Sequence, residues 1–577
     1  MTTHNMSNDT TLHANVPLTI LIIGAGIGGL ALGTSLSLSG HAVRILEAAP
    51  EIGEVGAGIQ VAPNLSRILD RWGLLSELKT KGGAVMLERN SLRRWEGGEE
   101  LGTAELMPGV GEKYGAPLMV AHRADLQRVL LNGALRAGCE LLTDHRVTDI
   151  DLAGTRVQLS TGEWITADTI LAADGIRSPT RHALSLLLST PDRPLPTGDA
   201  AYRVLIPRTQ MLQDPELSVL INQNVGIRWM GPGRHIMAYP IKGGEVYNMV
   251  LLHPDTSSTP TAESWTQRGS KAEMLAHYAA WNPTVTKLLN MVPEGEVMEW
   301  TLNSHAELAH WVYNNTALVG DACHPMLPYV AQGAAQAVED AAVLSTCLNL
   351  IEKKVDIPDA LKVYERLRLP RASAIQRSAA TTRAALHLPD GPEQRLRDAQ
   401  IREASSQAHM DSTAAGGGAK KNPDMWGDRA WQEFMWGVDV VEECVDKFGK
   451  VLEEVYNNSS IVRRLACALF VVLTILVHSV GTKAYCLSAI GTSFPVSFLK
   501  PERIPSEIFS GARRTGGMSS LLSSESNALV KVILLAGGGG SGRGINGGSG
   551  GLGGHGGFGG RHFVFVFIQL RGDGNAL

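Results

Sequence analysis

The sequence predicts an α/β fold followed by a C-terminal part of different composition, and three observations carry this prediction. Apolar strand-like runs alternate with helical periods from Leu18 to about Leu386. A glycine-rich turn joins the first of these strands to a helix. After about Cys444 the alternation ends, and glycine-rich and apolar stretches follow. The 577 residues, 44% apolar and 19% charged, suffice for two or three domains and exclude a collagen, a coiled coil or a globally disordered chain.

Charge and cysteine content narrow the class of protein further. The formal net charge is −5, whereas a dedicated nucleic-acid binder normally carries a clustered basic face, so we expect no nucleic-acid partner. The six cysteines contain no CxxC pair, which argues against a zinc module and a dense disulfide framework. We therefore predict a cytoplasmic protein with reduced thiols and no metal site, and the sequence indicates no protein partner.

The first motif is a GxGxxG loop at Gly24, Gly26 and Gly29. It directly follows the apolar run Leu18–Ile23 and opens a helix of small residues, predicted over Leu30–Ser39. In such a loop the first glycine makes the tight turn, the second lets the backbone approach a pyrophosphate, and the third lets helix and strand pack closely. The free N–H groups at the helix start favour phosphate groups.

The next predicted strand, Ala42–Leu46, ends at a carboxylate, Glu47. A carboxylate at this point can accept hydrogen bonds from the ribose hydroxyls of an adenine dinucleotide. It favours an unphosphorylated ribose, so the loop and Glu47 together predict FAD or NAD rather than NADP. These residues alone do not decide between the two.

Two later segments each run from an apolar strand into a turn with a carboxylate. Leu171–Ser178 carries Asp174, and Ala317–Pro325 carries Asp321 and leads to a helix start within Gln332–Ala341. With these three motifs in order, the chain resembles the single-component FAD-dependent aromatic hydroxylases, the family of salicylate hydroxylase and p-hydroxybenzoate hydroxylase. Each motif alone is weak, whereas the ordered trio is specific.

The resemblance covers about residues 17–445 and implies a Rossmann-like FAD-binding domain with an inserted β-sheet substrate domain. Within the family, the segment Glu54–Gln60 followed by Pro63 and Asn64 is most similar to the salicylate hydroxylase-like branch. No second GxGxxG follows a strand downstream. The resemblance therefore implies that NADH or NADPH is a co-substrate that binds transiently over the flavin, without a Rossmann domain of its own.

The resemblance also assigns cofactor contacts to individual residues. Asp321 would accept a hydrogen bond from a ribityl hydroxyl, and the N–H groups of Gly333 and Ala334 would stabilise negative charge on the reduced flavin. Arg123 belongs to a helix that would bind the pyrophosphate. Without the resemblance, Arg123 would be interpreted as a surface cation and Asp174 as a turn residue. The full predicted cofactor set is Gly24, Gly26, Gly29, Glu47, Ala48, Gly58, Arg123, Gln127, Asp174, Asp321, Gly333 and Ala334.

Between the second and third motifs, short strand-like runs predict a sheet. By the resemblance, an aromatic substrate would bind against one face of this sheet. The candidate catalytic residues are Arg203, which could pair with a phenolate or carboxylate, and Tyr239, which could bond a substrate hydroxyl or relay its proton. For both, the alternative is structural: an arginine on a sheet edge and a tyrosine that caps a core. The predicted strands are Ala200–Ile206, Ser218–Ile221, Gly226–Met230, His235–Pro240 and Tyr247–Leu252.

Four further reactive side chains are not counted in the predicted site. We expect His235 and His305 to be structural, and His324 to pack near the flavin without transferring a proton. Cys323 neighbours His324, but no base-and-orienter arrangement marks it as a nucleophile.

The resemblance implies hydroxylation of an electron-rich aromatic, such as a phenol, a salicylate-like acid or an aromatic polyketide. NADH or NADPH would reduce FAD, and O₂ would add to form a C4a-hydroperoxide whose terminal oxygen attacks the ring. Simple, decarboxylating and dearomatising outcomes stay open. Two alternatives stay open as well: a flavin-dependent reductase or oxidase on the same fold, and a membrane-tethered flavoprotein with a mainly recruiting role.

For the C-terminal part we predict helices followed by a tail. The tail is expected to be disordered or membrane-associated, or to be a mispredicted gene end. Residues 465–482 lack charged side chains and reach the lower limit for a membrane span. An aromatic cluster of Trp426, Trp431, Phe434, Met435 and Trp436 is expected to dock on the body. The predicted boundaries are a disordered arm 1–16, an FAD-binding domain 17–190 and 301–386, a substrate sheet 191–300, a helical segment 387–445, and a tail 446–577 with a glycine-rich linker 537–560.

Overall fold

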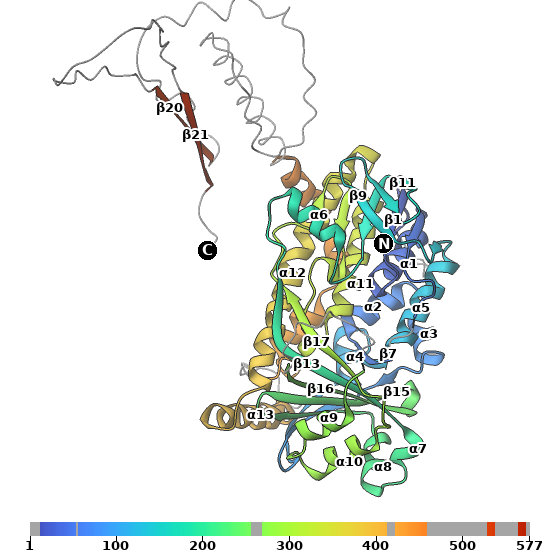
Figure 1. Cartoon of the computed structure of the whole chain (residues 1–577), viewed down its shortest axis with the longest axis vertical. Helices are drawn as coiled ribbons and strands as arrows, with labels where there is room; N and C mark the ends of the chain where they lie inside the picture. Colours follow the sequence, from blue (N-terminus) through green and yellow to red (C-terminus); the bar gives the residue numbers. More distant parts are fainter. Residues whose placement is uncertain are drawn as a thin grey trace, which may run out of the picture. The chain divides into compact units, whose positions relative to one another are not determined.

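The structure is a computed structural model of the chain, and it describes residues 12–53, 56–255, 268–411, 422–457, 528–536 and 564–572 (Figure 1). The chain divides into two compact units, residues 1–489 and 490–577. The first unit holds the α/β body, and the second holds a pair of strands.

A six-stranded sheet forms the core of the dinucleotide-binding part. In spatial order its strands are β18 (Val312–Tyr313), β19 (Thr316–Leu318), β12 (Thr169–Ala172), β1 (Thr19–Ile23), β2 (Ala42–Leu46) and β8 (Glu140–Leu142). All neighbours are parallel except β18, which closes one edge antiparallel. The central strands β1 and β12 are covered on both faces, which explains their nearly continuous apolar runs, whereas Arg44 of β2 and Glu140 of β8 form an exposed ion pair towards the edge of the sheet. The predicted strands of this part are thus confirmed.

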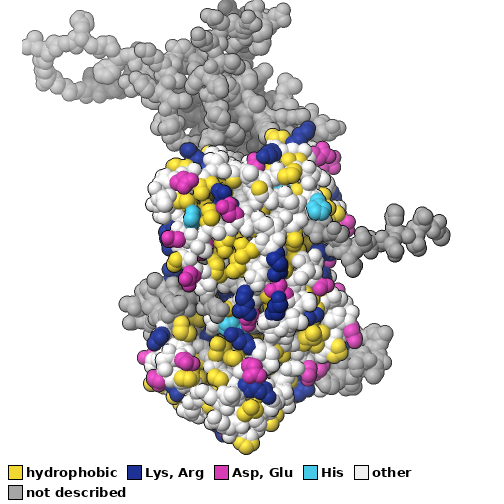
Figure 2. All heavy atoms as spheres, turned by 90° about the vertical axis from the view of Figure 1, so that its right-hand side faces the viewer, with side chains coloured by type: hydrophobic (Ala, Val, Ile, Leu, Met, Phe, Trp, Pro, Cys, Tyr) yellow, Lys and Arg dark blue, Asp and Glu magenta, His cyan; other side chains and the backbone are white. Residues whose placement is uncertain are grey.

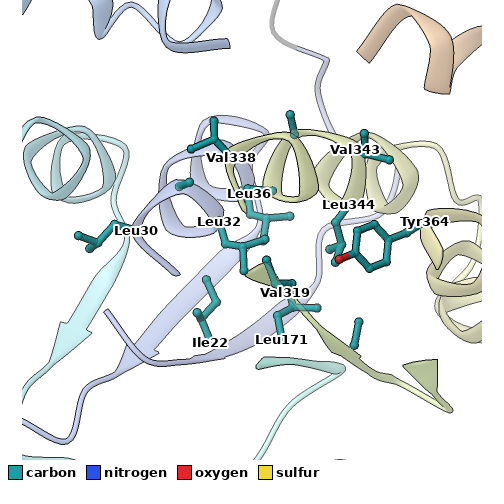
Figure 3. Close-up of a cluster of buried hydrophobic side chains, with 14 of the residues drawn as sticks. Ile22, Leu30, Leu32, Leu36, Leu171, Val319, Val338, Val343, Leu344 and Tyr364 are labelled. Atoms are coloured by element: carbon teal, nitrogen blue, oxygen red, sulfur yellow. The ribbon is translucent and has the colours of Figure 1, made fainter. Parts of the chain in front are cut away.

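Helices α1 (Ile27–Leu38) and α11 (Gly333–Asn349) pack side by side on this sheet (Figure 3). Leu32 and Leu36 of α1 and Leu344 of α11 gather with Ile22 and Leu171 of the strands, and all five are fully buried. Each such side chain contributes about 1.5–3 kcal/mol by leaving water. Helix α1 starts earlier than the sequence predicts, because the last part of the glycine loop already forms its first turn.

A seven-stranded sheet forms the second half of the body. In spatial order its strands are β17 (Met298–His305), β13 (Pro194–Pro207), β16 (Val246–Pro254), β15 (Arg234–Ile241), β14 (Val225–Gly231), β5 (Arg89–Arg94) and β6 (Glu100–Glu105). Strand β5 pairs parallel with β14. The sheet therefore unites strands from both sides of residue 190, where the sequence analysis divides the domains.

One predicted strand in this part is wrong. Residues Ser218–Ile221 belong to a helix, α8 (Pro215–Ile221), because Asp214 caps it by accepting the backbone N–H groups of Glu216 and Leu217. Proline at the first helical position favours the same outcome. Helix α8 covers the outer face of the sheet together with α7 (Arg208–Met211), α9 (Lys271–His277) and α10 (Pro283–Met291).

The 30-residue helix α12 (Ile357–Leu386), labelled in Figure 1, contributes side chains to the cores of both sheets. Its first half contributes Leu361 and Tyr364 to the core of the six-stranded sheet. Its second half contributes Ile375 and Ala379 to a cluster on the seven-stranded sheet. Because one helix packs in both cores, it fixes the two sheets relative to each other.

Residues 422–438 return to the body, as the sequence predicts for the aromatic cluster. Trp426, Met435 and Trp436 are buried with Met237 and Tyr239 of β15. This segment contains the short helix α14 (Arg429–Gln432) and a π-helical turn over Glu433–Gly437.

A further helix spans residues 440–457 and runs through residue 445, where the sequence analysis places the start of the tail. Val440, Cys444, Phe448 and Val455 lie at helical spacing and are buried against the six-stranded sheet's core. At the other end of the chain, the carbonyl of Leu12 accepts a hydrogen bond from Asn349. The predicted disordered arm is therefore corrected: residues 12–16 lie on the body, and residues 1–11 lie outside the described part.

Among the described residues, two small sheets and six further helices complete the main elements of the body. They are the sheet of β3 (Gly58–Val61), β7 (Met119–His122) and β4 (Val85–Met86), the sheet of β9 (Val147–Asp151), β10 (Arg156–Leu159) and β11 (Trp164–Thr166), and the helices α2 (Pro63–Arg71), α3 (Leu75–Thr80), α4 (Gly109–Tyr114), α5 (Arg123–Arg136), α6 (Pro179–Leu187) and α13 (Pro392–Asp411). On the face shown in Figure 2, several Lys and Arg side chains gather near the middle, and elsewhere basic and acidic side chains are interspersed.

In the second unit, β20 (Ala528–Ala536) and β21 (Val564–Gly572) pair antiparallel along their whole length. This pair stands where the sequence analysis predicts a disordered or membrane-associated tail. The candidate membrane segment 465–482 and the glycine-rich linker 537–560 lie outside the described residues. Within the described residues, no helix combines the length and apolar composition that crossing a membrane requires.

Candidate functional site

A cavity of about 390 Å³ is enclosed by the glycine loop, the start of α11 and one face of the seven-stranded sheet. It brings together segments that are more than 300 residues apart in the chain. The predicted site residues that line it are Gly26, Gly58, Arg123, Arg203, Tyr239, Asp321, Gly333 and Ala334. The predicted site residues outside its lining are Gly24, Gly29, Glu47, Ala48, Gln127 and Asp174.

The three glycines of the loop meet different surroundings. Gly24 has a φ of +95°, and a Cβ there would lie 2.6 Å from the carbonyl oxygen of Ala173. A Cβ at Gly29 would lie 1.9 Å from the carbonyl oxygen of Gly24, whereas a Cβ at Gly26 would meet nothing within 4 Å. Two glycines thus make the loop compact, and the third leaves open space at the cavity. This is the shape that a dinucleotide pyrophosphate requires, so the loop fits FAD.

Glu47 and Gln127 hold the loop in this shape. The carboxylate of Glu47 accepts hydrogen bonds from the backbone N–H groups of Ala25, at 2.7 Å, and Ala49, at 2.8 Å. Gln127 donates to the carbonyl of Ala25 at 3.2 Å. A carboxylate has about four acceptor positions, so Glu47 retains capacity for the ribose hydroxyls that the sequence analysis assigns to it.

Arg123 and Asp321 place opposite charges on the cavity wall. Burial raises the pKa of the Asp321 carboxyl, and the nearby cations of Arg123 and Arg181 oppose that rise. Burial lowers the pKa of Arg123, and the charge of Asp321 opposes that change. The two side chains therefore depend on each other for charge compensation, and both face the space where a cofactor's hydroxyl and phosphate groups would lie.

Gly333 and Ala334 begin the long helix α11, and their N–H groups are among the four at a helix start that have no intrahelical partner. Asp174 lies behind the wall, between two lining residues, Ala173 and Gly175. Its Oδ2 accepts the backbone N–H of Thr180 at 3.2 Å, and its Oδ1 has no partner among the described residues. Burial raises the pKa of this carboxyl.

The floor of the cavity is a row of side chains across four neighbouring strands. In register from β13 to β14, the row consists of Arg203, Val250, Met237 and Arg228, and all four line the cavity. Neighbouring strands lie about 4.8 Å apart, so the backbones of the two arginines are about 14 Å apart. The floor therefore carries a cation at each end and apolar side chains between them.

Arg203 lies at one end of this floor, and Tyr239, on β15, is close enough for the two side chains to interact electrostatically. The Arg203 guanidinium stacks over the Trp300 ring at 4.0 Å. Within the described residues, no carboxylate lies at ion-pair distance from Arg203, and its Nε has no hydrogen-bond partner. Burial and the neighbouring Arg123 cation lower the pKa of Arg203. This end of the cavity therefore lacks negative charge, and a bound anion would supply it.

His235 also lines the cavity, although the sequence analysis expects it to be structural. It shares a face of β15 with Met237 and Tyr239, because side chains alternate along a strand, and this period of two from Tyr239 is the signal that could have found it. Its Nδ1 lies 2.8 Å from Nε2 of His387, at the end of α12. Burial lowers the pKa of both rings. The partner is 152 residues away and has no sequence signal.

A buried network supports the turn that carries Asp321. Asp340 accepts from the backbone N–H of Gly320 at 3.0 Å, from His324 at 2.6 Å and from Arg368 at 2.8 Å. Burial alone would raise the pKa of Asp340, but the neighbouring cations lower it to about 2. Potential metal-ligand atoms of Cys323, His324 and Asp340 lie within 4.8 Å of one another, and Asp340 is already neutralised by Arg368.

Burial raises the pKa of the Cys323 thiol well above its ordinary value, which disfavours the thiolate that a nucleophile requires. His324 lies 5.2 Å from the Trp311 ring, centroid to centroid, and its Nε2 is bonded to Asp340. Both side chains thus lie behind the cavity wall and stabilise the turn.

A glycine loop that fits a dinucleotide, joined to a sheet-floored cavity, defines a flavin-binding class of protein, and the comparisons with known proteins agree. The family described as "FAD binding domain" matches residues 17–379. The chain belongs to this family and is an FAD-dependent monooxygenase. The predictions of fold class and of enzyme class are therefore confirmed.

Particular relatives are similar over most of their own length. The chain is 38% identical over 400 residues to the FAD-dependent monooxygenase atnJ of Arthrinium sp. The aligned region covers 69% of this chain and 91% of the relative. The chain is 35% identical over 384 residues to the 3-amino-4-hydroxybenzoate 2-monooxygenase PtmB3 of Streptomyces platensis, covering 66% and 91%. Among solved structures, a salicylate hydroxylase substrate complex has a TM-score of 0.60 at 25% identity and covers 76% of this chain and 98% of that one.

Proposed function

We propose that the chain hydroxylates an electron-rich aromatic ring that carries an anionic group, using NADH or NADPH and O₂. One oxygen atom of O₂ enters the ring as a hydroxyl group and the other leaves as water, while NAD(P)H and a proton supply the remaining two electrons and the hydrogen. The observation that carries this proposal is Arg203, a cavity cation without an acidic partner among the described residues.

Different residues of the chain would bind the substrate and the cofactor. FAD, when bound, supplies the oxygen chemistry. Arg203 would hold the anionic group by a charge-assisted hydrogen bond, and Tyr239 would bond the ring hydroxyl. Val250 and Met237 would contact the ring between them. The residues proposed to hold FAD are Gly24, Gly26, Gly29, Glu47, Ala48, Gly58, Arg123, Gln127, Asp174, Asp321, Gly333 and Ala334.

The names of the relatives support the same substrate class. The Streptomyces platensis relative is named for 3-amino-4-hydroxybenzoate, and the similar solved structure is a salicylate hydroxylase. Both compounds combine a carboxylate with a ring hydroxyl. An aromatic with this pair of groups would match a cavity that contains the Arg203 cation and the Tyr239 hydroxyl.

The test uses the purified full-length protein. We expect a flavin absorbance spectrum, and NADH or NADPH oxidation that rises when salicylate or another hydroxybenzoate is added. We expect one atom of labelled O₂ in the hydroxylated product. Oxidation that is indifferent to every aromatic of a panel of phenols and hydroxybenzoates would instead indicate a flavin reductase or oxidase.

Replacing the cation tests the proposed anion site. Arg203→Met should raise KM for a hydroxybenzoate about 10- to 100-fold, because a hydrogen bond to a charged group contributes about 1.5–3 kcal/mol. Arg203→Lys keeps the charge and should recover part of the loss. An Arg203→Met enzyme with unchanged KM would contradict the proposed role.

A further inference from the structure

The second arginine of the cavity floor, Arg228, is neutralised from behind. Its Nη1 donates to Oδ1 of Asp424 at 2.9 Å. Only 4% of Arg228 and 2% of Asp424 is exposed, so this ion pair is fully withdrawn from bulk water. Arg228 lines the cavity, whereas Asp424 does not. The carboxylate therefore lies behind the cation, on the side away from a ligand.

The two ends of the floor consequently differ in charge. Arg203 has no carboxylate at ion-pair distance among the described residues, and Arg228 has Asp424. The side chains between them, Val250 and Met237, are apolar. An elongated ligand in this cavity thus meets a net positive charge at one end and a neutral ion pair at the other.

Asp424 is held in place by its own segment. Its backbone N–H donates to the side chain of Asn422 at 2.9 Å, and its carbonyl accepts the N–H of Gly427 at 2.9 Å. Trp426, between them, is fully buried. Arg371 further anchors the segment through the carbonyl of Met435, at 2.9 Å. These contacts fix the backbone that carries Asp424, and the carboxylate is held at Arg228 through Oδ1, while its buried Oδ2 has no hydrogen-bond partner among the described residues.

This segment lies beyond residues 17–379, the part that matches the FAD-binding family. The charge at one end of the cavity is thus set by a residue outside the family's common domain. A residue in such a position can change ligand preference without altering the residues that face the cofactor.

We propose that Asp424 is a specificity-determining residue that restricts the cavity to aromatics with one anionic group. A second anionic group at the Arg228 end would lose its hydration and meet a cation that already has a fixed carboxylate partner, so it would be rejected. This inference rests on the proposed function, because it assumes that the first anionic group binds at Arg203.

Two ligands of matched shape test the wild-type protein. 4-Methylsalicylate carries one carboxylate, and 2-hydroxyterephthalate replaces its methyl group with a second carboxylate. Dissociation constants are measured by titration calorimetry on the flavin-loaded full-length chain, which needs no turnover. We expect the monoanion to bind at least tenfold more tightly. Equal or tighter binding of the dianion to the wild-type protein would overturn the inference without any variant.

Variants of Asp424 then test whether this residue causes the preference for the monoanion. Asp424→Asn should shift the ratio of the two dissociation constants at least tenfold toward 2-hydroxyterephthalate, because Arg228 is left without a countercharge. The double variant Asp424→Asn with Arg228→Gln has the same loss of the carboxylate but no cation, and it should return to monoanion preference. An unchanged ratio in Asp424→Asn would overturn the inference. If Asp424→Asn does not fold, the wild-type ratio still tests the inference, because a dianion that binds at least as tightly as the monoanion overturns it.

Failure of the proposed function gives a different result. If neither ligand binds and no hydroxybenzoate stimulates NAD(P)H oxidation, the anionic substrate class is wrong, and the inference falls with it. If 4-methylsalicylate binds and Arg203→Met weakens it, but the ratio does not depend on Asp424, only the inference fails.

Discussion

Gly26 and Gly29 lie three residues apart in the same loop, but an added methyl group meets opposite surroundings at the two positions. At Gly29 it would lie 1.9 Å from a backbone carbonyl oxygen, which cannot rotate away. At Gly26 it would enter open space at the cavity. One glycine is therefore required by the fold, and the other by whatever occupies the cavity.

Alanine substitutions should separate these two requirements. Gly29→Ala should lower the free energy of unfolding by about 1–3 kcal/mol or more, because the loop must shift to relieve the overlap. Gly26→Ala should leave the unfolding of the flavin-free protein unchanged and reduce flavin content. The measurements are urea unfolding of both flavin-free variants and the flavin-to-protein absorbance ratio. Equal effects of the two variants on unfolding would contradict this reading.

At the scale of elements, the C-terminal segment is part of the body rather than an appendage. The helix over residues 440–457 buries Phe448 and Val455 in the core of the six-stranded sheet. The preceding residues 422–438 supply Asp424, which pairs with Arg228 behind the cavity wall, and Trp436, which joins the cluster that contains Tyr239. The segment therefore contributes both to stability and to the site.

Truncation should show where the body ends. A chain ending at residue 457 should keep the stability of the body. A chain ending at residue 445 loses Phe448 and Val455, and its free energy of unfolding should fall by about 3–6 kcal/mol, since each buried apolar side chain contributes about 1.5–3 kcal/mol. Urea unfolding monitored by tryptophan fluorescence measures both. Phe448→Ala in the full chain is the matched control and should reproduce part of the loss, and equal stability of the two truncations would refute the placement.

At the scale of the whole molecule, buried titratable groups make stability depend on pH in two separate ranges. The pKa of His387 is about 4 in the folded chain, because burial lowers it, and the pKa of its partner His235 is lowered as well. The groups that act on them are Arg228 for His235, and Asp199 and Arg383 for His387. The folded state binds fewer protons than the unfolded state, so stability falls as the pH drops below about 6.5.

The buried carboxylates act in a lower range. Cations lower the pKa of Glu339 and Asp340 to about 2 against the effect of burial, so their contribution persists at pH 5 and is lost as the pH falls toward 2. Between pH 7.5 and pH 5 the contribution of these two carboxylates is therefore nearly constant.

We expect a loss of about 2 kcal/mol from each histidine of the pair between these two pH values, since pH 5 is about 1.5 units below the unfolded pKa. Other buried histidines, such as His253, titrate in the same direction. His387→Asn keeps a hydrogen-bonding side chain that does not titrate, and its loss should be smaller by about 2 kcal/mol. A variant with the wild-type pH dependence would show that His387 is not responsible.

The features of the fold that could be predicted from the sequence are those that depend on neighbouring residues. The parallel strands, the glycine loop and the start of α11 depend on apolar runs and on turns within a few residues, and these predictions match the structure. The strand predicted over Ser218–Ile221 is wrong, because its apolar run is too short to distinguish a strand from a helix, and the cap at Asp214 decides. The roles proposed for the cofactor residues, and for Arg203 and Tyr239, stay predictions that the experiments above test.

The sequence by itself determined the dinucleotide loop, the three motifs and the family, because each motif consists of residues close together in the chain. Only the tertiary structure decided which side chains share the cavity. Arg203 and Arg228 become two ends of one floor through the register of four strands. Asp424 and His387, which lie beyond the residues that match the family, contact the lining residues Arg228 and His235 from behind. Such contacts depend on packing between distant segments, and no local pattern of residues encodes a charge pair across 196 positions.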